Sequence, residues 1–333
     1  MASAADPVVE VTDLTKEYGS VTAVDGVSFE IRADEVFALV GPNGAGKTTT
    51  VEMLECLRSP TSGSATVMGH AVLEEARTVK EHIGVVPQAF DTFDRLTVRE
   101  NVALARRMYD DGLAVDDVLD QLDIAEWADT RFGSLSGGLQ QRTGIAMALV
   151  SDPAVLFLDE PTTGLDPAAR RSTWRQIERL ANLGTAVVLT THYMEEVEEL
   201  ADRAALLVEG SLEAVDSVDA LVDRYGGDVK LVVSRGGDGY DDEDGDAAED
   251  EDGTGTDDGD AVEATLRAAA TEVYRDDTGN LVGLFDDRET AQEAFGRVHR
   301  LEGNRSIQLT TAGMEDVFLR LVGAAVDRQG ELQ

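Results

Sequence analysis

Hydrophobic residues recur along the chain in two patterns that predict two kinds of β-strand. Between residues 8 and 31 apolar and polar positions alternate, which is typical of antiparallel strands, and Gly19-Ser20 marks a turn between them. Four later runs are apolar at nearly every position, which indicates strands buried in the core of a domain. These runs are 36–40, 83–86, 154–158 and 186–191.

Helical periodicity dominates two other parts of the first 225 residues. A helix is expected at 51–57, and it is followed by a strand at 64–68. From residue 96 to 150 apolar residues recur at helical spacing, so we expect a helical subdomain, about residues 89–150, between two buried strands. The pattern therefore predicts an α/β domain at 8–225, with an antiparallel β subdomain and this helical subdomain.

The remaining residues predict a smaller α+β domain at 229–323. Its segments follow the order β-α-β-β-α-β, with a final helix. Strands are expected at 229–233, 272–274, 281–285 and 306–309, and helices at 262–270, 290–301 and 314–322. Within this domain, residues 236–260 contain 13 acidic residues and no Lys or Arg. Such a tract cannot build a core and shows no spaced cation ligands, so we expect a disordered insert.

Length and composition are those of a globular chain with one or two domains. The 333 residues are 42% hydrophobic, and no run approaches the roughly 18 apolar residues of a membrane span. The N-terminus lacks a basic region followed by an apolar stretch, so no signal peptide is indicated. Cys56 is the single cysteine, which excludes an internal disulfide and fits a reducing compartment. We expect a cytoplasmic protein.

The chain is strongly acidic, with 66 Asp and Glu against 28 Lys and Arg and a formal charge of −38. Only 13 of the acidic residues lie in 236–260, so the excess extends over the whole chain. Such a charge repels nucleic acid at ordinary salt, so no nucleic-acid partner is expected. Molar salt shortens the Debye length to roughly 3 Å and would relieve the self-repulsion. We hypothesise adaptation to a high-salt cytoplasm, like that of haloarchaea.

The segment after the strand at 36–40 has the spacing of a phosphate-binding loop. Gly41, Gly46 and the pair Lys47-Thr48 match G-x-x-x-x-G-K-[ST] in the strand–loop–helix setting that the motif requires. We predict that this loop binds a nucleoside triphosphate, with Lys47 on the β- and γ-phosphates and Thr48 on Mg²⁺. The alternative is a glycine-rich turn with a chance lysine. The candidate residues are Gly41, Pro42, Asn43, Gly44, Ala45, Gly46, Lys47, Thr48 and Thr49.

Polar residues follow the other three buried strands. Asp159 ends one strand, where a carboxylate near Mg²⁺ is expected, and Glu160 beside it can act as a base for water. Gln88 follows another strand and can reach Mg²⁺ or water, or else cap loop backbone. His192 follows the strand at 186–191. Two solvated acids are the alternative interpretation of Asp159 and Glu160.

Two further segments contain candidate binding residues. Ser136 is a good helix N-cap. The two glycines after it, Gly137 and Gly138, would allow a phosphate to come close to the backbone. Tyr18 lies at the turn of the first two strands, where its ring can stack on a purine base. An ordinary aromatic at a strand end is the alternative for Tyr18.

Residues 8–225 resemble the ATP-binding subunits of ABC transporters. The specific features are LSGGLQQR, whose Gly138 lies 21 residues before Asp159, followed by Glu160-Pro161, Leu165-Asp166 and Thr191-His192. The resemblance implies ATP and Mg²⁺ as ligands and ATP hydrolysis as the reaction. It identifies Glu160 as the general base, places His192 on the γ-phosphate and places adenine on Tyr18. The implied Mg²⁺ contacts are Thr48, Gln88 and Asp159.

The resemblance also implies partners. The signature residues would face the nucleotide held by a second ATP-binding subunit, in a homodimer whose interface includes Asp166; these residues are Ser136, Gly137, Gly138 and Gln140. Gln88 would lie where a separate membrane permease acts, with the chain peripheral at the inner face of the membrane.

One further segment bears on the direction of transport. Residues 314–319, MEDVFL, resemble the closing segment of the ATPases that serve ABC-2-type exporters, including drug-resistance exporters. One alternative is a non-transport ATPase acting on ribosomes or DNA, but the single ATPase domain and the acidic charge disfavour it. A regulatory binder without turnover is disfavoured by the presence of Gln88, Glu160 and His192.

Overall fold

The computed structural model describes residues 7–88, 92–227, 229–235, 257–276, 279–301 and 305–330. The chain packs into two compact units, residues 1–218 with 321–333 and residues 219–320. The boundary between 218 and 219 falls in the short helix α8 (Val218–Leu221), a few residues before the predicted domain end at 225.

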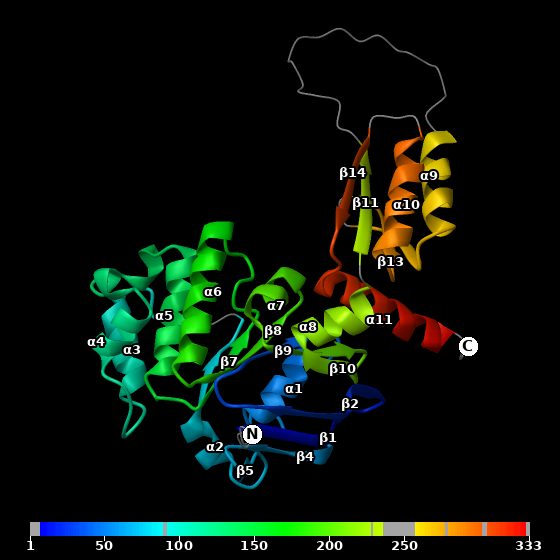
Figure 1. Ribbon diagram of the computed structural model, residues 1–333. Helices are drawn as coiled ribbons and strands as arrows, with labels where there is room; N and C mark the ends of the chain where they lie inside the picture. Colours follow the sequence, from blue (N-terminus) through cyan, green and yellow to red (C-terminus); the bar gives the residue numbers. More distant parts are fainter. Residues whose placement is uncertain are drawn as a thin grey trace, which may run out of the picture. The chain divides into compact units, whose positions relative to one another are not determined.

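An antiparallel sheet opens the first unit (Figure 1). Strand β1 (Val9–Tyr18) pairs with β2 (Val21–Ile31) on one side and with β4 (Ser62–Val67) on the other, and β5 (His70–Ala71) forms the far edge. The alternating pattern thus forms the two predicted strands, joined at Gly19-Ser20.

A six-stranded sheet forms the centre of the first unit, in the order β10-β9-β3-β8-β7-β6. Its neighbours are parallel except β10, which runs antiparallel to β9. Every residue of β3 and β8 is buried, as the continuous apolar runs predict. The strands are β3 (Val36–Val40), β6 (Ile83–Val86), β7 (Val155–Asp159), β8 (Ala186–Thr191), β9 (Arg203–Val208) and β10 (Ser211–Ser217).

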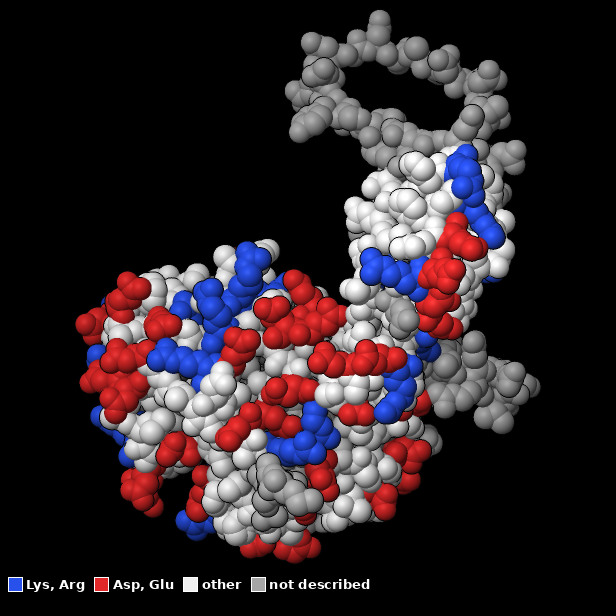
Figure 2. Space-filling model, viewed as in Figure 1, with Lys and Arg blue, Asp and Glu red and all other residues white. Residues whose placement is uncertain are grey.

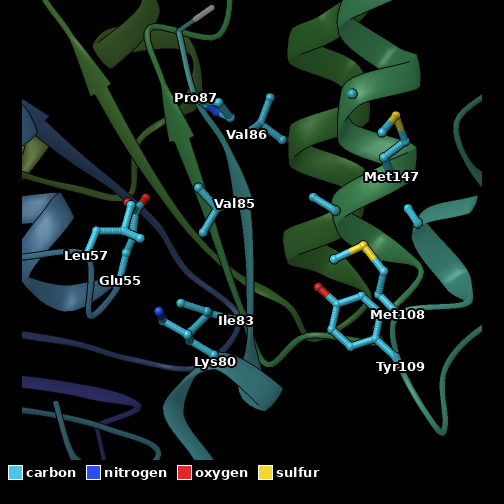
Figure 3. Close-up of a pocket in the computed structure, with 13 residues that line it drawn as sticks. Glu55, Leu57, Lys80, Ile83, Val85, Val86, Pro87, Met108, Tyr109 and Met147 are labelled. Carbon is cyan, nitrogen blue, oxygen red and sulfur yellow. The ribbon is translucent and has the colours of Figure 1, made fainter. Parts of the chain in front are cut away.

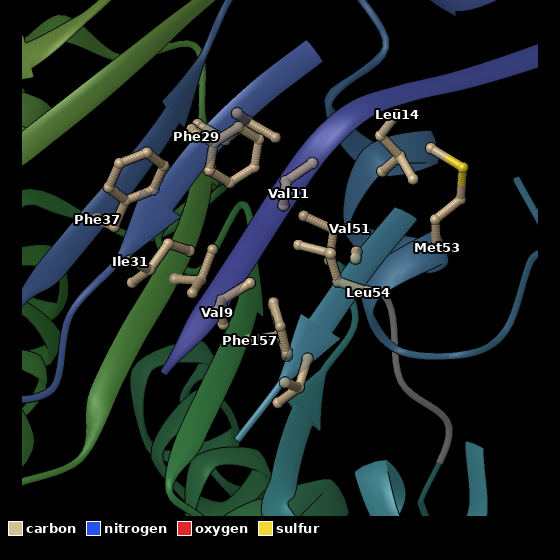
Figure 4. Packing of buried hydrophobic residues seen from close by; sticks show 14 of the residues in the cluster. Val9, Val11, Leu14, Phe29, Ile31, Phe37, Val51, Met53, Leu54 and Phe157 are labelled. Carbon is tan, nitrogen blue, oxygen red and sulfur yellow. The ribbon is translucent and has the colours of Figure 1, made fainter. Parts of the chain in front are cut away.

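The two sheets share one hydrophobic core with helix α1 (Lys47–Leu54). Figure 4 shows Val9, Val11 and Ile31 of the antiparallel sheet packed near Phe37 and Phe157 of the parallel sheet, with side chains of α1 beside them. The rings of Phe29 and Phe37 stack across the two sheets with centroids 5.4 Å apart. This packing holds α1, and therefore the loop before it, in a fixed position.

Helices form the predicted helical subdomain, which is the helical insert of the first unit. A capping box, in which Thr97 and Glu100 satisfy each other's backbone N–H groups, fixes the start of α3. The helices of the insert are α3 (Val98–Arg106), α4 (Val115–Gln121) and α5 (Gly137–Leu149), with single 3₁₀ turns at Ala125–Trp127 and Phe132–Ser134. The other helices of the unit are α2 (Ala76–His82), α6 (Pro167–Asn182) and α7 (Met194–Leu200).

The second unit has the β-α-β-β-α-β order that the sequence predicts. Its strands pair antiparallel in the order β12-β13-β11-β14, and helices α9 and α10 pack on one face through Leu266, Ala291 and Ala294. The elements are β11 (Val229–Arg235), α9 (Asp257–Arg267), β12 (Glu272–Arg275), β13 (Leu281–Phe285), α10 (Arg288–His299), β14 (Arg305–Thr310) and the first part of α11 (Met314–Gly330), whose residues from 321 on belong to the first unit.

One boundary in this unit differs from the prediction. Helix α9 begins at Asp257, so residues 257–260 are helical and the predicted disordered insert at 236–260 is too long. Acidic residues in a first turn are stabilised by the positive end of the helix dipole, so a run of acids does not exclude a helix there. The rest of that insert, 236–256, lies outside the described residues. Within the described ranges, no helix combines the length and hydropathy that a bilayer span requires.

Candidate active site

The phosphate loop, residues 41–49, joins β3 to α1 at the carboxyl end of the parallel sheet. Its backbone passes so close to two neighbouring strands that only glycine fits. A Cβ on Gly41 would lie 2.2 Å from the carbonyl oxygen of Leu207, and one on Gly46 would lie 2.4 Å from that of Ala23. Gly46 also has a φ of 97°, which is favourable only for glycine. The loop is therefore wedged between β2 and β9.

Lys47 lies beneath the loop with 6% of its surface exposed. Its ammonium donates hydrogen bonds to the carbonyl oxygens of Gly41 at 2.7 Å and Pro42 at 3.0 Å. Burial lowers the pKa of Lys47, and the nearby carboxylates of Glu160 and Asp159 oppose this shift. The lysine and the two acids thus lie within electrostatic range of one another, while Thr48 at the first turn of α1 is exposed.

Glu160 is held by side chains from three different parts of the chain. Its Oε2 accepts hydrogen bonds from Gln88 Nε2 at 2.9 Å and from Thr163 Oγ1 at 3.0 Å. Its Oε1 lies 3.1 Å from His192 Nδ1. The ends of β6, β7 and β8 therefore bring together the three candidate catalytic residues that the sequence places at separate strand ends.

Thr190 positions both acids. Strands β7 and β8 pair in a register that places Asp159 opposite Thr190, whose hydroxyl donates a hydrogen bond to Asp159 Oδ1. The N–H of Glu160 lies 3.1 Å from both the hydroxyl and the carbonyl oxygen of Thr190. Glu160 itself has a left-handed backbone with a φ of 46°, an uncommon conformation for this residue type. The surrounding hydrogen bonds hold this conformation in place.

Glu196 of α7 forms a buried support next to this cluster. Its Oε1 accepts hydrogen bonds from Thr162 Oγ1 at 2.8 Å and from Trp174 Nε1 at 3.2 Å. Burial raises the pKa of Glu196, and the hydrogen-bond donors around it oppose that shift. Thr162 follows Glu160 by two residues, so Glu196 ties the segment after the acids to α6 and α7.

The candidate signature residues lie at the start of α5. Ser136 is the N-cap residue of α5, as the sequence predicts, but its side chain makes no capping hydrogen bond. Gly138 packs against α6 so closely that a Cβ would lie 2.8 Å from Ala169 Cβ. Gln140 Nε2 donates to the carbonyl of Phe132 at 3.4 Å. Gly138 therefore has a packing role that its sequence context does not reveal.

Asp166 and Tyr18 have local contacts of their own. Asp166 caps α6 by accepting hydrogen bonds from the N–H groups of Ala168 and Ala169, each at 2.9 Å. Tyr18 is 42% exposed, and Lys16 Nζ lies 5.2 Å from the centroid of its ring. Arg58 Cζ lies 5.4 Å from the same centroid.

Comparison with known proteins agrees with this geometry. Residues 24–163 match the family model described as ABC transporter. The chain is 36% identical over 324 residues to the daunorubicin resistance ATP-binding protein of Streptomyces coeruleorubidus, covering 95% of each chain. The chain belongs to the ABC transporter ATP-binding family.

Other relatives of this ABC ATPase are consistent with the assignment. It is 41% identical over 249 residues to a Nod factor export ATP-binding protein of Sinorhizobium fredii, covering 70% of this chain and 72% of that one. It is also similar to the solved structure of an ATP-binding subunit of an ABC transporter, with 25% identity and a TM-score of 0.59. That match covers 66% of this chain and 93% of the solved chain. The predicted P-loop NTPase fold and ATPase activity coupled to transport are thereby confirmed.

Sequence reasoning missed three residues around the site of this ABC ATPase. Thr190 and Thr163 carry hydroxyls that hold the two acids. Thr190 had an available signal, a threonine near the end of an otherwise apolar strand, whereas Thr163 lies in a turn and had none. Glu55 follows α1 and has no such signal, because it resembles an ordinary acid at a helix end. It is 6% exposed, and burial raises its pKa to about 7, with further contributions from Asp159 and Glu52.

Proposed function

We propose that this ABC ATPase powers export through a separate permease of the ABC-2 type. The observation that carries the proposal is the end-to-end similarity to a daunorubicin resistance ATP-binding protein, which includes the second unit as well as the ATPase unit. The Nod factor export relative, which shares 41% identity with the chain, supports the same direction of transport.

In this proposal Glu160 is the general base that accepts a proton from the attacking water. Its carboxylate is fixed by Gln88, Thr163 and His192, so it needs little rearrangement to hold a water in line with the γ-phosphate. Lys47 exchanges its two loop carbonyls for oxygens of the β- and γ-phosphates, and His192 contacts the γ-phosphate. Preorganised positive charge, which stabilises the negative charge of the transition state, is the main contribution that a protein makes to phosphoryl transfer.

Mg²⁺ would be held by Thr48, Asp159 and Gln88 together with phosphate oxygens. These side chains provide a hydroxyl, a carboxylate and an amide oxygen, which suit a hard cation. The Gln88 nitrogen is engaged with Glu160, so its oxygen is the atom left for the metal. Among the described residues, no group of three or more His, Cys, Asp and Glu side chains is arranged so that it could bind a metal ion. Bound Mg²⁺ would neutralise charge that develops on the phosphates.

The nucleotide site is completed by a second copy of the chain. Ser136 and Gly137 are exposed at the start of α5, and the Ser136 hydroxyl is not consumed by capping. In the dimer they, Gly138 and Gln140 face the partner's ATP, Asp166 lies at the interface and Tyr18 stacks on adenine. The permease docks beside Gln88, which places the dimer at the inner face of the membrane.

The test of the catalytic assignment is Glu160→Gln in the purified chain. ATP binding should persist, whereas phosphate release should fall by about 10²–10⁴-fold because the amide cannot accept the proton. Glu195→Gln is the matched control, since Glu195 is exposed on α7 and pairs only with Arg170 among the described contacts. Near-normal turnover by Glu160→Gln, with the control also active, would contradict the general-base role.

We also infer that the protein works at high salt. Figure 2 shows acidic side chains spread over much of the visible surface of the ATPase unit, with basic side chains in smaller groups among them. Salt screens repulsion among exposed charges, so stability and ATPase activity should both rise between 0.2 and about 2 M KCl. Full activity in dilute buffer with no gain on adding KCl would rule this adaptation out.

A further inference from the structure

A cavity of about 410 Å³ lies in the ATPase unit between β6 and the helical insert. Figure 3 shows its walls, which come from β6, α2, the segment after α1, and the helices α3 and α5 with the residues that follow α3. Most of its lining is apolar: Ile83, Val85, Val86, Met108 and Met147 are examples. Met108 at its edge is 78% exposed, and Leu57 is 64% exposed. Large exposed apolar side chains around a cavity are typical of a surface that another protein covers.

Two charged side chains, Glu55 and Lys80, line this cavity beside the apolar ones. Only 6% of the Glu55 surface is exposed, yet its carboxyl makes no hydrogen bond or ion pair with any of the described residues. Lys80 lines the same cavity without forming an ion pair with Glu55. The charges that act most on Glu55 are negative, those of Asp159 and Glu52. A buried carboxylate without a partner is costly, so this position favours a cation supplied from outside.

We propose that Glu55 receives a Lys or Arg side chain from the docking segment of the permease. This inference rests on the proposed function and identifies the chemistry of the partner at the docking site. The apolar walls suit the methylene stem of such a side chain, and the carboxyl suits its charged end. A cation beside Glu55 would also remove the cost that raises the pKa of this group to about 7.

The first experiment identifies, in the host cell, the protein segment that binds in the cavity. A photo-reactive benzoylphenylalanine replaces Met108 at the edge of the cavity, and the cross-linked peptide is sequenced. A segment of an integral membrane protein that carries Lys or Arg is the expected product. The captured membrane protein is then co-expressed with the full chain, and the affinity of the detergent-solubilised complex is measured.

Substitutions at Glu55 test the ion pair. Glu55→Gln should weaken the complex about tenfold or more, since a charge-assisted contact is lost, and Glu55→Lys should abolish it. Exchanging the captured Lys or Arg for Glu should restore binding to Glu55→Lys. Glu74→Lys is the matched control, because Glu74 is exposed next to α2 and does not line the cavity. A single cooperative thermal unfolding transition of each variant shows that it is folded.

The outcomes separate the two proposals. If a membrane protein is captured but its segment lacks Lys and Arg, or if Glu55→Gln binds it normally, the inference about Glu55 is overturned and the proposed function stands. If the cross-link captures only a second copy of this chain, or no membrane protein, docking of a permease at this cavity is refuted together with the inference.

Discussion

Replacing Glu55 by Gln should stabilise the isolated protein, and the gain should grow with pH. The amide has nearly the same size as the carboxyl but cannot ionise. In the native protein the carboxyl is buried without a hydrogen-bond partner among the described residues, and burial raises its pKa from 4.5 to about 7. The proposed contact with the permease would explain why a group that costs stability lies here.

The sign and size of the effect follow from this pKa. Between pH 4.5 and 7 the native state holds the proton more tightly than the unfolded state, so raising the pH favours unfolding. Each pKa unit is worth about 1.4 kcal/mol, so ionisation of Glu55 costs the native state about 3 kcal/mol in total at pH 8. About 2 kcal/mol of this cost develops between pH 5.5 and pH 8. The advantage of Glu55→Gln should widen by that amount.

Urea unfolding followed by tryptophan fluorescence measures the effect. Trp127 and Trp174, the only tryptophans, both lie in the ATPase unit, so the signal reports on that unit. Wild type and variant are compared at pH 5.5 and 8 in the same salt. The control Glu74→Gln, at an exposed position, should change the free energy of unfolding by under about 0.5 kcal/mol at either pH. A difference between wild type and Glu55→Gln that stays constant or shrinks as pH rises would refute the reasoning.

Three further predictions concern the site. If two chains complete each nucleotide site, ATPase activity should rise more steeply than linearly with protein concentration in the dilute range; strict proportionality where the protein is monomeric would contradict this. Thr190→Val should lower kcat about tenfold with little change in ATP affinity, because a hydrogen bond to Asp159 is lost, and Thr190→Ser should retain activity; equal losses in both variants would exclude a hydroxyl effect. Gly138→Ala should destabilise the unit by about 1–3 kcal/mol through its contact with Ala169, and adding Ala169→Gly should restore the thermal midpoint; an unchanged midpoint in the single variant would show that this packing is unimportant.

Much of the ATPase unit could be predicted because its signals are local. Continuous apolar runs mark the parallel strands, and the glycine and lysine spacing marks the phosphate loop between β3 and α1. Boundaries were less reliable, since α1 begins at Lys47 rather than at 51. Glycine is a poor helix former, and Gly46 adopts the left-handed conformation directly before α1. A glycine at this position therefore gives no sign that a helix begins at the next residue.

The sequence by itself determined the class of fold, the family and which residue types lie at the strand ends. Only the tertiary structure decided that Gln88, Glu160 and His192 meet, because their strands are brought side by side by burial of residues far apart in the chain. It also decided the state of Glu55. A carboxyl has an ordinary pKa wherever water surrounds it, and the packing of β6, α3 and α5 near this one leaves only 6% of the Glu55 surface exposed.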